Sequence, residues 1–403
     1  MEKLAIDGGA KVFTKDLTPV RWPPVYPETA EKLKDIYLNH GWSFYGAEEI
    51  KFNEEFAKFT GAANCIAMAN GTVTLQCALE ALGIGAGDEV IVPAFTWLAT
   101  GTAVVETGAL PVVVDIEPDT WCIDVAAAEA AITPKTRAII PVHLFGSMAN
   151  MDKVMALAHK YNLKVVEDCA HAHGGLWDGK HMGTLGDVGS FSFQESKTLS
   201  SGEGGACLTN DDRLAEIIGR LSHIGYPFGA KQGKKYTAPP MGLVCHNYRF
   251  TDFQAAILLG QLAHLEEDTI KREKAAEFLR AGLDAIPGVK CQARGAKATR
   301  QGFYMFGFSI DTAQLKPGLT RDNVTKALAA EGLNIGYGWG HPMYRQNLWS
   351  VPTSKYRIDS CAVAEDLIYK RMFTSPLSWL MRPQDELECY IEAVRKVMTA
   401  YHA

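Results

Sequence analysis

The sequence predicts an α/β fold, with a mostly parallel seven-stranded sheet in a large domain and a small α+β domain at the C-terminus. Two observations predict it. From residue 47 onward, short apolar runs alternate with helical patterns, as in parallel sheets that helices cover on both faces. Polar and glycine-rich motifs follow several of these runs, and ligands of such sheets bind beyond the carboxyl ends of the strands.

The chain is expected to contain an arm followed by two domains. Residues 1–46 are rich in proline, glycine and aromatic side chains, and they predict an irregular N-terminal arm. The aromatic loop 41–46 either anchors this arm or lines a substrate pocket. The large domain is expected over 47–264, and a linker helix with the small domain over 265–403.

Apolar runs and helical patterns locate the elements of both domains. The expected strands of the sheet are 64–70, 89–93, 111–115, 137–143, 163–168, 188–193 and 205–209. Helices are expected at 29–38, 71–82, 98–106 and 151–161, as two long stretches over 252–264 and 265–285, and at 321–331 and 383–400. A further strand is expected over 303–310 in the small domain.

Composition and charge are those of an ordinary globular protein. Of the 403 residues, 47% are apolar and 21% are charged. The net charge of −6 gives no reason to expect a nucleic acid or an anionic membrane as partner. The nine cysteines form no Cys-x-x-Cys pair, which favours a reducing, cytoplasmic compartment. We expect no signal segment at the N-terminus and no membrane span.

One lysine occupies a position unusual for a solvated charge. Lys197 follows the apolar run 188–193, lies among small residues, and is followed by glycines that lead into the next strand. Loss of hydration lowers the pKa of a lysine and makes its amine a nucleophile for carbonyls. The alternative is a surface lysine that pairs with Glu195 or Glu203.

An acidic residue ends the neighbouring strand. Asp168 is the last residue of the run 163–168, and a carboxylate buried there requires a cationic partner. Together with the lysine and the glycines, it indicates a site for pyridoxal phosphate (PLP), which needs an imine-forming lysine and an acid beside its ring nitrogen. The alternative for Asp168 is helix capping. Glu167 faces the opposite side of the strand and is expected to be structural.

A helix N-terminus provides a candidate phosphate site. Gly71 and Thr72 follow the run 64–70 and open a helix, whose free amides and threonine hydroxyl suit an anion. Capping of the same helix by Asn70 or Thr72 is a second interpretation, and both can hold together. Ser192 alternates toward the lysine side of its strand and either adds a phosphate hydroxyl or makes a local hydrogen bond.

Six short motifs occur in order along the chain. They are Gly71-Thr72, Trp97, Glu167-Asp168-x-Ala-His171, Ser192-Phe-Gln-x-x-Lys197, Gly202-Glu-Gly-Gly205 and His246-Asn247-Tyr-Arg. In these motifs the chain resembles the DegT/StrS family of sugar aminotransferases, over residues 41 to 261 and more loosely beyond. The resemblance implies a fold-type I, aspartate aminotransferase-like PLP enzyme. Any one motif alone would be weak support.

The resemblance also implies roles for single residues. Lys197 would form the imine with PLP and then carry the Cα proton, and Asp168 would keep the ring nitrogen protonated. His171 would lie beside the ring hydroxyl, although a core histidine is a serious alternative. Trp97 would stack on the pyridine ring, while Phe95 is expected in the core.

Further residues would reach across a subunit interface or toward the substrate. Asn247 matches the segment that in the family enters the neighbouring subunit's site, which implies a homodimer with shared active sites; a turn asparagine is the alternative. Gln194, Tyr337 and His341 are expected to contact the substrate, the last two from the small domain.

Variation within the motifs points to a substrate class. The lysine segment, 192–197, resembles that of glutamine-dependent inosose and 2-deoxy-inosose aminotransferases, whereas 170–174 is similar to aminohydroxybenzoate synthases. The implied reaction moves an amino group from L-glutamine or L-glutamate to a cyclic polyhydroxy ketone in aminocyclitol biosynthesis. A nucleotide-linked keto-sugar is the alternative acceptor, because a basic loop with Lys231, Lys234 and Lys235 offers a site for a diphosphate. A solvated loop without a ligand is an equal interpretation of these lysines.

Other classes of protein fit less well. PLP-dependent sugar dehydratases of this fold replace the imine-forming lysine by histidine, and Lys197 is present. A PLP-fold regulatory protein would need a basic recognition stretch, which is not visible. The glycines over 83–87 precede a strand, so they do not form a dinucleotide-binding fingerprint. His171, His173 and Cys169 lack a complementary set of metal ligands.

Overall fold

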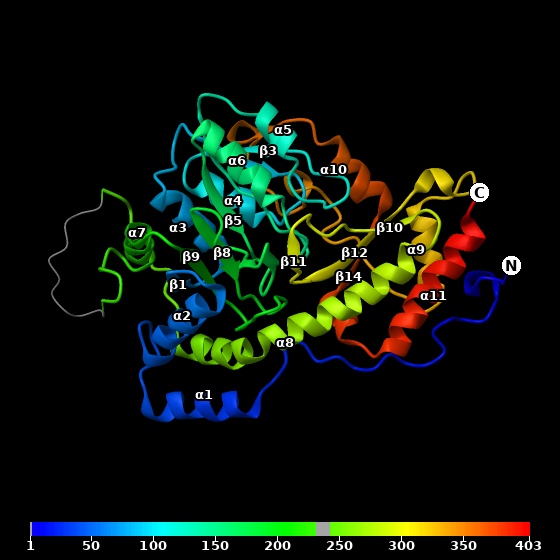
Figure 1. Cartoon of the computed structure of the whole chain (residues 1–403), viewed down its shortest axis with the longest axis horizontal. Helices are drawn as coiled ribbons and strands as arrows, with labels where there is room; N and C mark the ends of the chain where they lie inside the picture. Colours follow the sequence, from blue (N-terminus) through cyan, green and yellow to red (C-terminus); the bar gives the residue numbers. More distant parts are fainter. Residues whose placement is uncertain (1, 231–241) are drawn as a thin grey trace.

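The computed structural model describes residues 2–230 and 242–403 and contains a sheet of eight strands (Figure 1). The strands are β1 (Asn64–Met68), β2 (Glu89–Pro93), β3 (Leu110–Val114), β4 (Thr136–Ile139), β5 (Lys164–Asp168), β8 (Val188–Ser192), β9 (Gly205–Thr209) and β13 (Arg357–Ile358). Their order across the sheet is β1-β9-β8-β5-β4-β2-β3-β13. β9 runs antiparallel to its neighbours β1 and β8, and the other pairs are parallel.

All seven strands expected from the apolar runs are present. Their side chains explain why: Val90, Ile91 and Val92 of β2 are all completely buried, because helices cover both faces of the sheet. The eighth strand, β13, was not expected. It has only two residues, pairs with β3 at the edge, and comes from the C-terminal third of the chain, so no apolar run marks it.

Eleven α-helices lie within the described residues. They are α1 (Pro27–Asn39), α2 (Ala47–Thr60), α3 (Gly71–Ala81), α4 (Ala99–Glu106), α5 (Val125–Ala130), α6 (Met151–Tyr161), α7 (Asp212–Ser222), α8 (Asp252–Leu283), α9 (Arg321–Ala330), α10 (Ala362–Asp366) and α11 (Gln384–Tyr401). The N-cap side chains of Asn70, Asn150 and Asp211 accept backbone N–H bonds and fix where α3, α6 and α7 begin.

The expectation of two successive long helices over 252–285 is wrong. A single helix of 32 residues, α8, begins at a capping box formed by Thr251 and Gln254 and continues to Leu283. We placed the division between His264 and Leu265, but neither residue adjoins a proline or glycine that would end a helix there. Its first half packs against α1 and α2 and its second half against α11, so α8 runs along both domains (Figure 1).

The C-terminal part forms a second, smaller core. A three-stranded antiparallel sheet contains β10 (Val289–Cys291), β12 (Met305–Ile310) and β14 (Met372–Pro376). Phe306, Phe308 and Tyr390 are buried between this sheet and the helices α8, α9 and α11. A third small sheet joins the two halves of the chain through β11 (Ala298–Arg300), β6 (Leu176–Trp177) and β7 (Lys180–His181). The domain limits stay predictions, and the limit at 264/265 falls inside α8.

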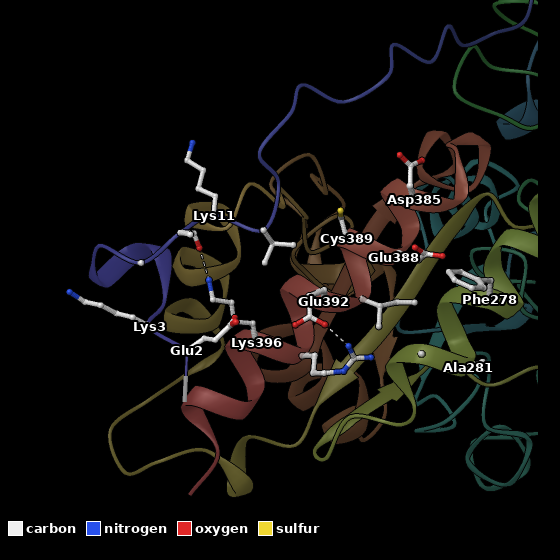
Figure 2. Close-up of a pocket in the computed structure, with 16 residues that line it drawn as sticks. Glu2, Lys3, Lys11, Phe278, Ala281, Asp385, Glu388, Cys389, Glu392 and Lys396 are labelled. Atoms are coloured by element: carbon white, nitrogen blue, oxygen red, sulfur yellow. Dashed lines mark hydrogen bonds and ion pairs between the residues drawn. The ribbon is translucent and has the colours of Figure 1, made fainter.

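The N-terminal segment is fixed to the small domain by a buried ion pair. Lys396 lies 2.9 Å from the Glu331 carboxylate and donates a hydrogen bond to the carbonyl of Ala10. Glu331 also accepts bonds from the backbone N–H groups of Ala5 and Val12. A groove of about 1160 Å³ lies between this segment, α8 and α11; Figure 2 shows Lys396 on one wall with Glu388 and Glu392 further along α11.

Two bulk features complete the fold. All nine cysteines are free thiols, and most of them are buried. In the parts of the chain that the structure describes, none of the helices combines the length and the apolar character that crossing a bilayer requires.

Candidate active site

A cavity of about 470 Å³ opens at the carboxyl ends of four strands of the sheet. Its walls include residues that end or follow β1, β2, β5 and β8, where ligands of parallel sheets bind. Most of the predicted site residues meet here: Gly71, Thr72, Trp97, Asp168, His171, Ser192, Gln194 and Lys197. Asn247, Tyr337 and His341 do not line this cavity.

Lys197 points into the cavity without a carboxylate partner. Among the described residues, neither Glu195 nor Glu203 nor any other carboxylate comes within 4.0 Å of its amine Nζ, so a surface ion pair does not account for it. Burial lowers the pKa of Lys197 to about 8, against the opposing charge of Asp168. Its Nζ lies 4.4 Å from the centroid of the Tyr304 ring. A larger fraction of this amine is therefore uncharged at neutral pH than for an exposed lysine.

Asp168 is a buried carboxylate whose oxygens are both oriented by hydrogen bonds. Oδ2 accepts a bond of 2.9 Å from the Thr100 hydroxyl, and Oδ1 accepts one of 3.2 Å from the N–H of Ala170. Burial raises the pKa of Asp168, while the Thr100 hydrogen bond acts in the opposite direction. A cationic ring N–H would relieve this burial cost, so the residue suits a pyridinium.

Glu167 is structural, as strand alternation predicted. Its carboxylate is completely buried on the opposite side of β5 and accepts bonds from the backbone N–H groups of Gly183, Leu185 and Gly186. Burial acts to raise the pKa of Glu167, but His143 and these N–H groups outweigh it and hold that pKa below its usual value.

His143, Glu167 and Cys169 form a compact buried cluster whose donor atoms lie within 4.8 Å of one another. Both ring nitrogens of His143 are already used. Nδ1 accepts from the N–H of Ala149, so Nε2 carries the proton and donates to Glu167 across 3.2 Å. Glu167 in turn has three backbone donors. The cluster thus fixes the end of β5 through its own hydrogen bonds.

The start of α3 has the shape of a cradle for an anion. A Cβ at Gly71 would lie 2.6 Å from the Cβ of Ser192, so only glycine allows the helix to approach β8 this closely. Asn70 accepts bonds from the N–H groups of Thr72 and Val73, which confirms the capping interpretation. Thr72 and Ser192 line the cavity beside the helix N-terminus. The Ser192 hydroxyl also accepts a bond of 3.5 Å from the N–H of Gln194, the local hydrogen bond of the alternative interpretation.

His171 stacks on an aromatic ring. The ring lies 4.1 Å from that of Tyr304 with an angle of 11° between them. Burial lowers the pKa of His171 well below its ordinary value, so the ring is neutral. Its Nδ1 accepts from the N–H of Phe145, which leaves the proton on Nε2. Phe95 is completely buried, as expected, whereas Trp97 is 40% exposed.

Among the cavity residues that escaped the sequence reasoning are Thr100, Tyr304 and Trp339. Tyr304 immediately precedes β12 within an apolar run, so nothing in its pattern separates it from core residues. Trp339 stands between Gly338 and Gly340, and this spacing was a usable signal, since two glycines around one large side chain favour a turn that projects it.

The two residues expected from that region have other partners. The Tyr337 hydroxyl lies 2.5 Å from that of Thr325, and the guanidinium of Arg321 lies 3.7 Å from the Tyr337 ring. His341 has its Nδ1 3.2 Å from the hydroxyl of Tyr369.

Asn247, the residue expected to act across an interface, lies outside this cavity. Asn247 is exposed and forms a backbone bridge with His223. Lys231, Lys234 and Lys235 fall outside the described residues.

Comparison with known proteins identifies the family. Residues 26–395 match the family model described as the DegT/DnrJ/EryC1/StrS aminotransferase family. The chain belongs to this family. It is therefore a PLP-dependent aminotransferase, and its α/β architecture is that of fold-type I PLP enzymes.

Similar proteins include enzymes named for cyclitol substrates. A putative L-glutamine:3-amino-2,3-dideoxy-scyllo-inosose aminotransferase of Micromonospora echinospora is 40% identical, over 87% of this chain and 83% of that protein. An L-glutamine:2-deoxy-scyllo-inosose aminotransferase of Streptoalloteichus tenebrarius is 38% identical, over 88% of this chain and 84% of that protein. Among solved structures, 3-amino-5-hydroxybenzoic acid synthase is 30% identical, with a TM-score of 0.84, over 96% of this chain and 100% of that one.

Proposed function

We propose that this enzyme transfers an amino group from L-glutamine or L-glutamate to a cyclic polyhydroxy ketone, such as scyllo-inosose or 2-deoxy-scyllo-inosose. The product is an aminocyclitol of the kind built into aminocyclitol antibiotics. The observation that carries the proposal is the 40% and 38% identity to enzymes named for such substrates, across most of their length.

The charge of the cavity supports an acceptor without a diphosphate. Within the described part of the chain, Lys197 is the only lysine or arginine in the cavity wall, and it is needed for the cofactor. Glu203 adds a negative charge to the same wall. A nucleotide-linked sugar carries two phosphate charges, which proteins bind with cationic side chains. A neutral ring with hydroxyl groups matches this wall better.

The residues of the cavity fit PLP. When bound, the cofactor supplies an aldehyde for the amine and an electron sink in its ring. Lys197 would bind at the aldehyde and afterwards carry the proton between carbon atoms of cofactor and substrate. Asp168, held by Thr100, would keep a proton on the ring nitrogen. Gly71, Thr72 and Ser192 would bind the phosphate, as the close approach of Gly71 to Ser192 allows.

The remaining predicted residues would hold the ring and the substrate. His171 has its Nε2–H free to donate to the ring hydroxyl, because Nδ1 is used by the backbone. Trp97 would stack on the pyridine ring. Gln194 is held in place by Ser196, whose N–H and hydroxyl both donate to its Oε1, and its amide N–H groups would then bind hydroxyls of the acceptor.

A homodimer with shared active sites is the proposed assembly. Asn247 is exposed and lies outside the cavity of its own chain, as expected for a residue that serves the partner's site. The apolar side chains of Tyr37, Leu38 and Trp42 are more than half exposed, and burial against a second copy would remove them from water. We place the enzyme in the cytoplasm, because nine free thiols are compatible with a reducing compartment.

Spectra of the purified enzyme test the proposal. With PLP added, the visible absorbance of the cofactor should disappear on addition of L-glutamine or L-glutamate and return on addition of 2-deoxy-scyllo-inosose. Loss of the band without recovery by any cyclitol ketone, but with recovery by a nucleotide-linked keto-sugar, would contradict the substrate assignment. Formation of an aromatic product with strong ultraviolet absorbance would instead identify an aminohydroxybenzoate synthase.

A further inference from the structure

Trp339 forms part of the cavity wall although it lies far from the other wall residues in sequence. Its indole contacts aromatic rings from three separate segments of the large domain. The ring centroids lie 5.5 Å from Phe145, 5.7 Å from His171 and 5.8 Å from Trp97. Trp339 thus closes one side of the cavity with an apolar face.

The backbone around Trp339 is built to direct this side chain. Gly338 and Gly340 have φ angles of +57° and +72°, in the left-handed region that favours glycine. The N–H of Gly338 donates to the Thr374 hydroxyl across 2.6 Å, and the N–H of Gly340 donates to the carbonyl of Tyr337 across 3.0 Å. A Cβ at Gly338 would lie 3.2 Å from the Phe145 ring. The two glycines and the two hydrogen bonds therefore fix the backbone turn, and this turn places the indole in the cavity wall.

We propose that Trp339 is the specificity-determining residue for the acceptor, and that its indole packs against the carbon face of the cyclitol ring. The inference rests on the proposed function and names the contact that selects its substrate. A polyhydroxylated ring has hydroxyls around its edge and C–H groups on its faces. An aromatic wall binds such a face, and polar side chains bind the edge.

The cavity offers both kinds of surface. Trp339 and Trp97 provide aromatic surface at an interplanar angle of 47°, and Gln194, Ser196 and Glu203 provide hydrogen-bonding groups. The expected substrate contacts Tyr337 and His341 belong to the same turn, but their hydroxyl and ring nitrogen face Thr325 and Tyr369. Of these three aromatic residues of the turn, Trp339 is the one that lines the cavity.

The test uses the PLP-loaded enzyme and two substitutions. Trp339→Ala removes the face, and Trp339→Leu keeps apolar bulk without an aromatic ring. Both should raise KM for 2-deoxy-scyllo-inosose by about 10- to 100-fold, the range for lost contacts in an apolar pocket. The dissociation constant of scyllo-inositol, a cyclitol that cannot be aminated, should rise by a similar factor in calorimetry. The rate at which L-glutamine bleaches the cofactor reports the donor half-reaction separately, and it should fall by a smaller factor than the acceptor half-reaction.

A matched control lies ten residues further on. Trp349→Leu makes the same chemical change at a tryptophan that packs on Tyr356 and does not line the cavity, so KM should not change. If the alanine variant fails to fold, as shown by its melting temperature and cofactor content, the Trp339→Leu variant alone tests the inference.

Two results would overturn the inference. One is an unaltered KM and an unaltered scyllo-inositol dissociation constant in a folded Trp339 variant. The other is an equal rise in KM for Trp349→Leu. Failure of the proposed function is seen separately, because the unaltered enzyme would then aminate no cyclitol ketone at all.

Discussion

The amine Nζ of Lys197 lies 4.4 Å from the centroid of the Tyr304 ring, and the Tyr304 hydroxyl lies 3.0 Å from that of Ser196, the residue before the lysine. One tyrosine thus contacts both the amine and the loop that carries it. The face of an aromatic ring stabilises a cation by about 0.5–2 kcal/mol. Tyr304 therefore favours the charged form of Lys197 and opposes the effect of burial.

This contact predicts the behaviour of Tyr304 variants. Tyr304→Leu should lower the pKa of Lys197 below its value of about 8, by roughly 0.4–1.5 units. The pH dependence of the rate at which cofactor-free enzyme reacts with PLP measures this pKa. Tyr304→Phe keeps the ring and serves as the control. An unchanged pKa in the leucine variant would show that the ring does not act on the amine.

Lys197→Ala should abolish turnover, because no other described amine lines the cavity. The variant should still bind cofactor and donor but release less than one equivalent of product per site. Product formation is counted over long incubation with an excess of both substrates. Sustained multiple turnovers would remove Lys197 from the mechanism.

Asp168→Asn should retain PLP and lose most of its rate. The phosphate contacts proposed for Gly71, Thr72 and Ser192 remain, but an amide cannot stabilise a protonated ring nitrogen. Loss of one partner of a buried ion pair costs about 3–5 kcal/mol, or roughly 150- to 5000-fold in rate. The rate at which L-glutamine bleaches the cofactor, followed in a stopped-flow instrument, measures this loss. Thr100→Val removes the 2.9 Å hydrogen bond to Asp168, together with the 2.8 Å contact to the Thr96 hydroxyl, and should give a smaller loss. A near-normal rate in Asp168→Asn refutes the role.

The depressed pKa of Lys197 predicts how stability depends on pH. In the folded, cofactor-free protein this pKa is about 8, and in the unfolded chain it is near 10.5, so the unfolded state binds more protons between these values. Burial of the charge destabilises the fold at pH 7, and this cost fades as pH rises from about 8 to 10.5. Lys197→Met should therefore be more stable at pH 7, by on the order of 3 kcal/mol.

Urea unfolding of the unaltered protein and the Lys197→Met variant, both without cofactor, between pH 7 and 10.5 tests the direction of this pH dependence. The advantage of the methionine variant should shrink steadily with rising pH. An advantage that is constant across this range would mean that the Lys197 pKa is not depressed.

The shared-site assembly predicts complementation between two inactive proteins. Asn247→Ala and Lys197→Ala are each purified and then mixed into verified hybrid dimers. If Asn247 serves the partner's site, one site of each hybrid has both native residues, and activity returns toward half. If Asn247 serves its own chain, every site keeps one lesion and mixing recovers nothing. The comparison requires that Asn247→Ala alone shows a substantial defect.

The central sheet could be predicted because burial on both faces leaves continuous apolar runs. The residues at the ends of β5 and β8 could be predicted because their polar types are unusual there. β13 could not, since its two residues, Arg357 and Ile358, are placed by pairing with β3 and not by their own pattern. The unbroken course of α8 was missed because its apolar stripe faces different partners along its length.

The same distinction, between residues marked by a local pattern and residues placed by distant contacts, holds for the cavity. Lys197 and Asp168 carry a chemical signal in their sequence neighbourhood. Tyr304 is placed by the backbone of Phe145, whose carbonyl accepts its N–H, 159 residues earlier in the chain. No local pattern records such a contact. In the turn that holds Trp339, residue type alone favoured its neighbours Tyr337 and His341, and the left-handed glycines decide which ring enters the cavity.

The continuity of α8 has a mechanical consequence. At 1.5 Å per residue, its 32 residues form a helix about 48 Å long that packs against both domains. A hinge rotation of one domain against the other would have to bend this helix. We infer that substrates enter the cavity without such a rotation, through local movement of the side chains at its opening.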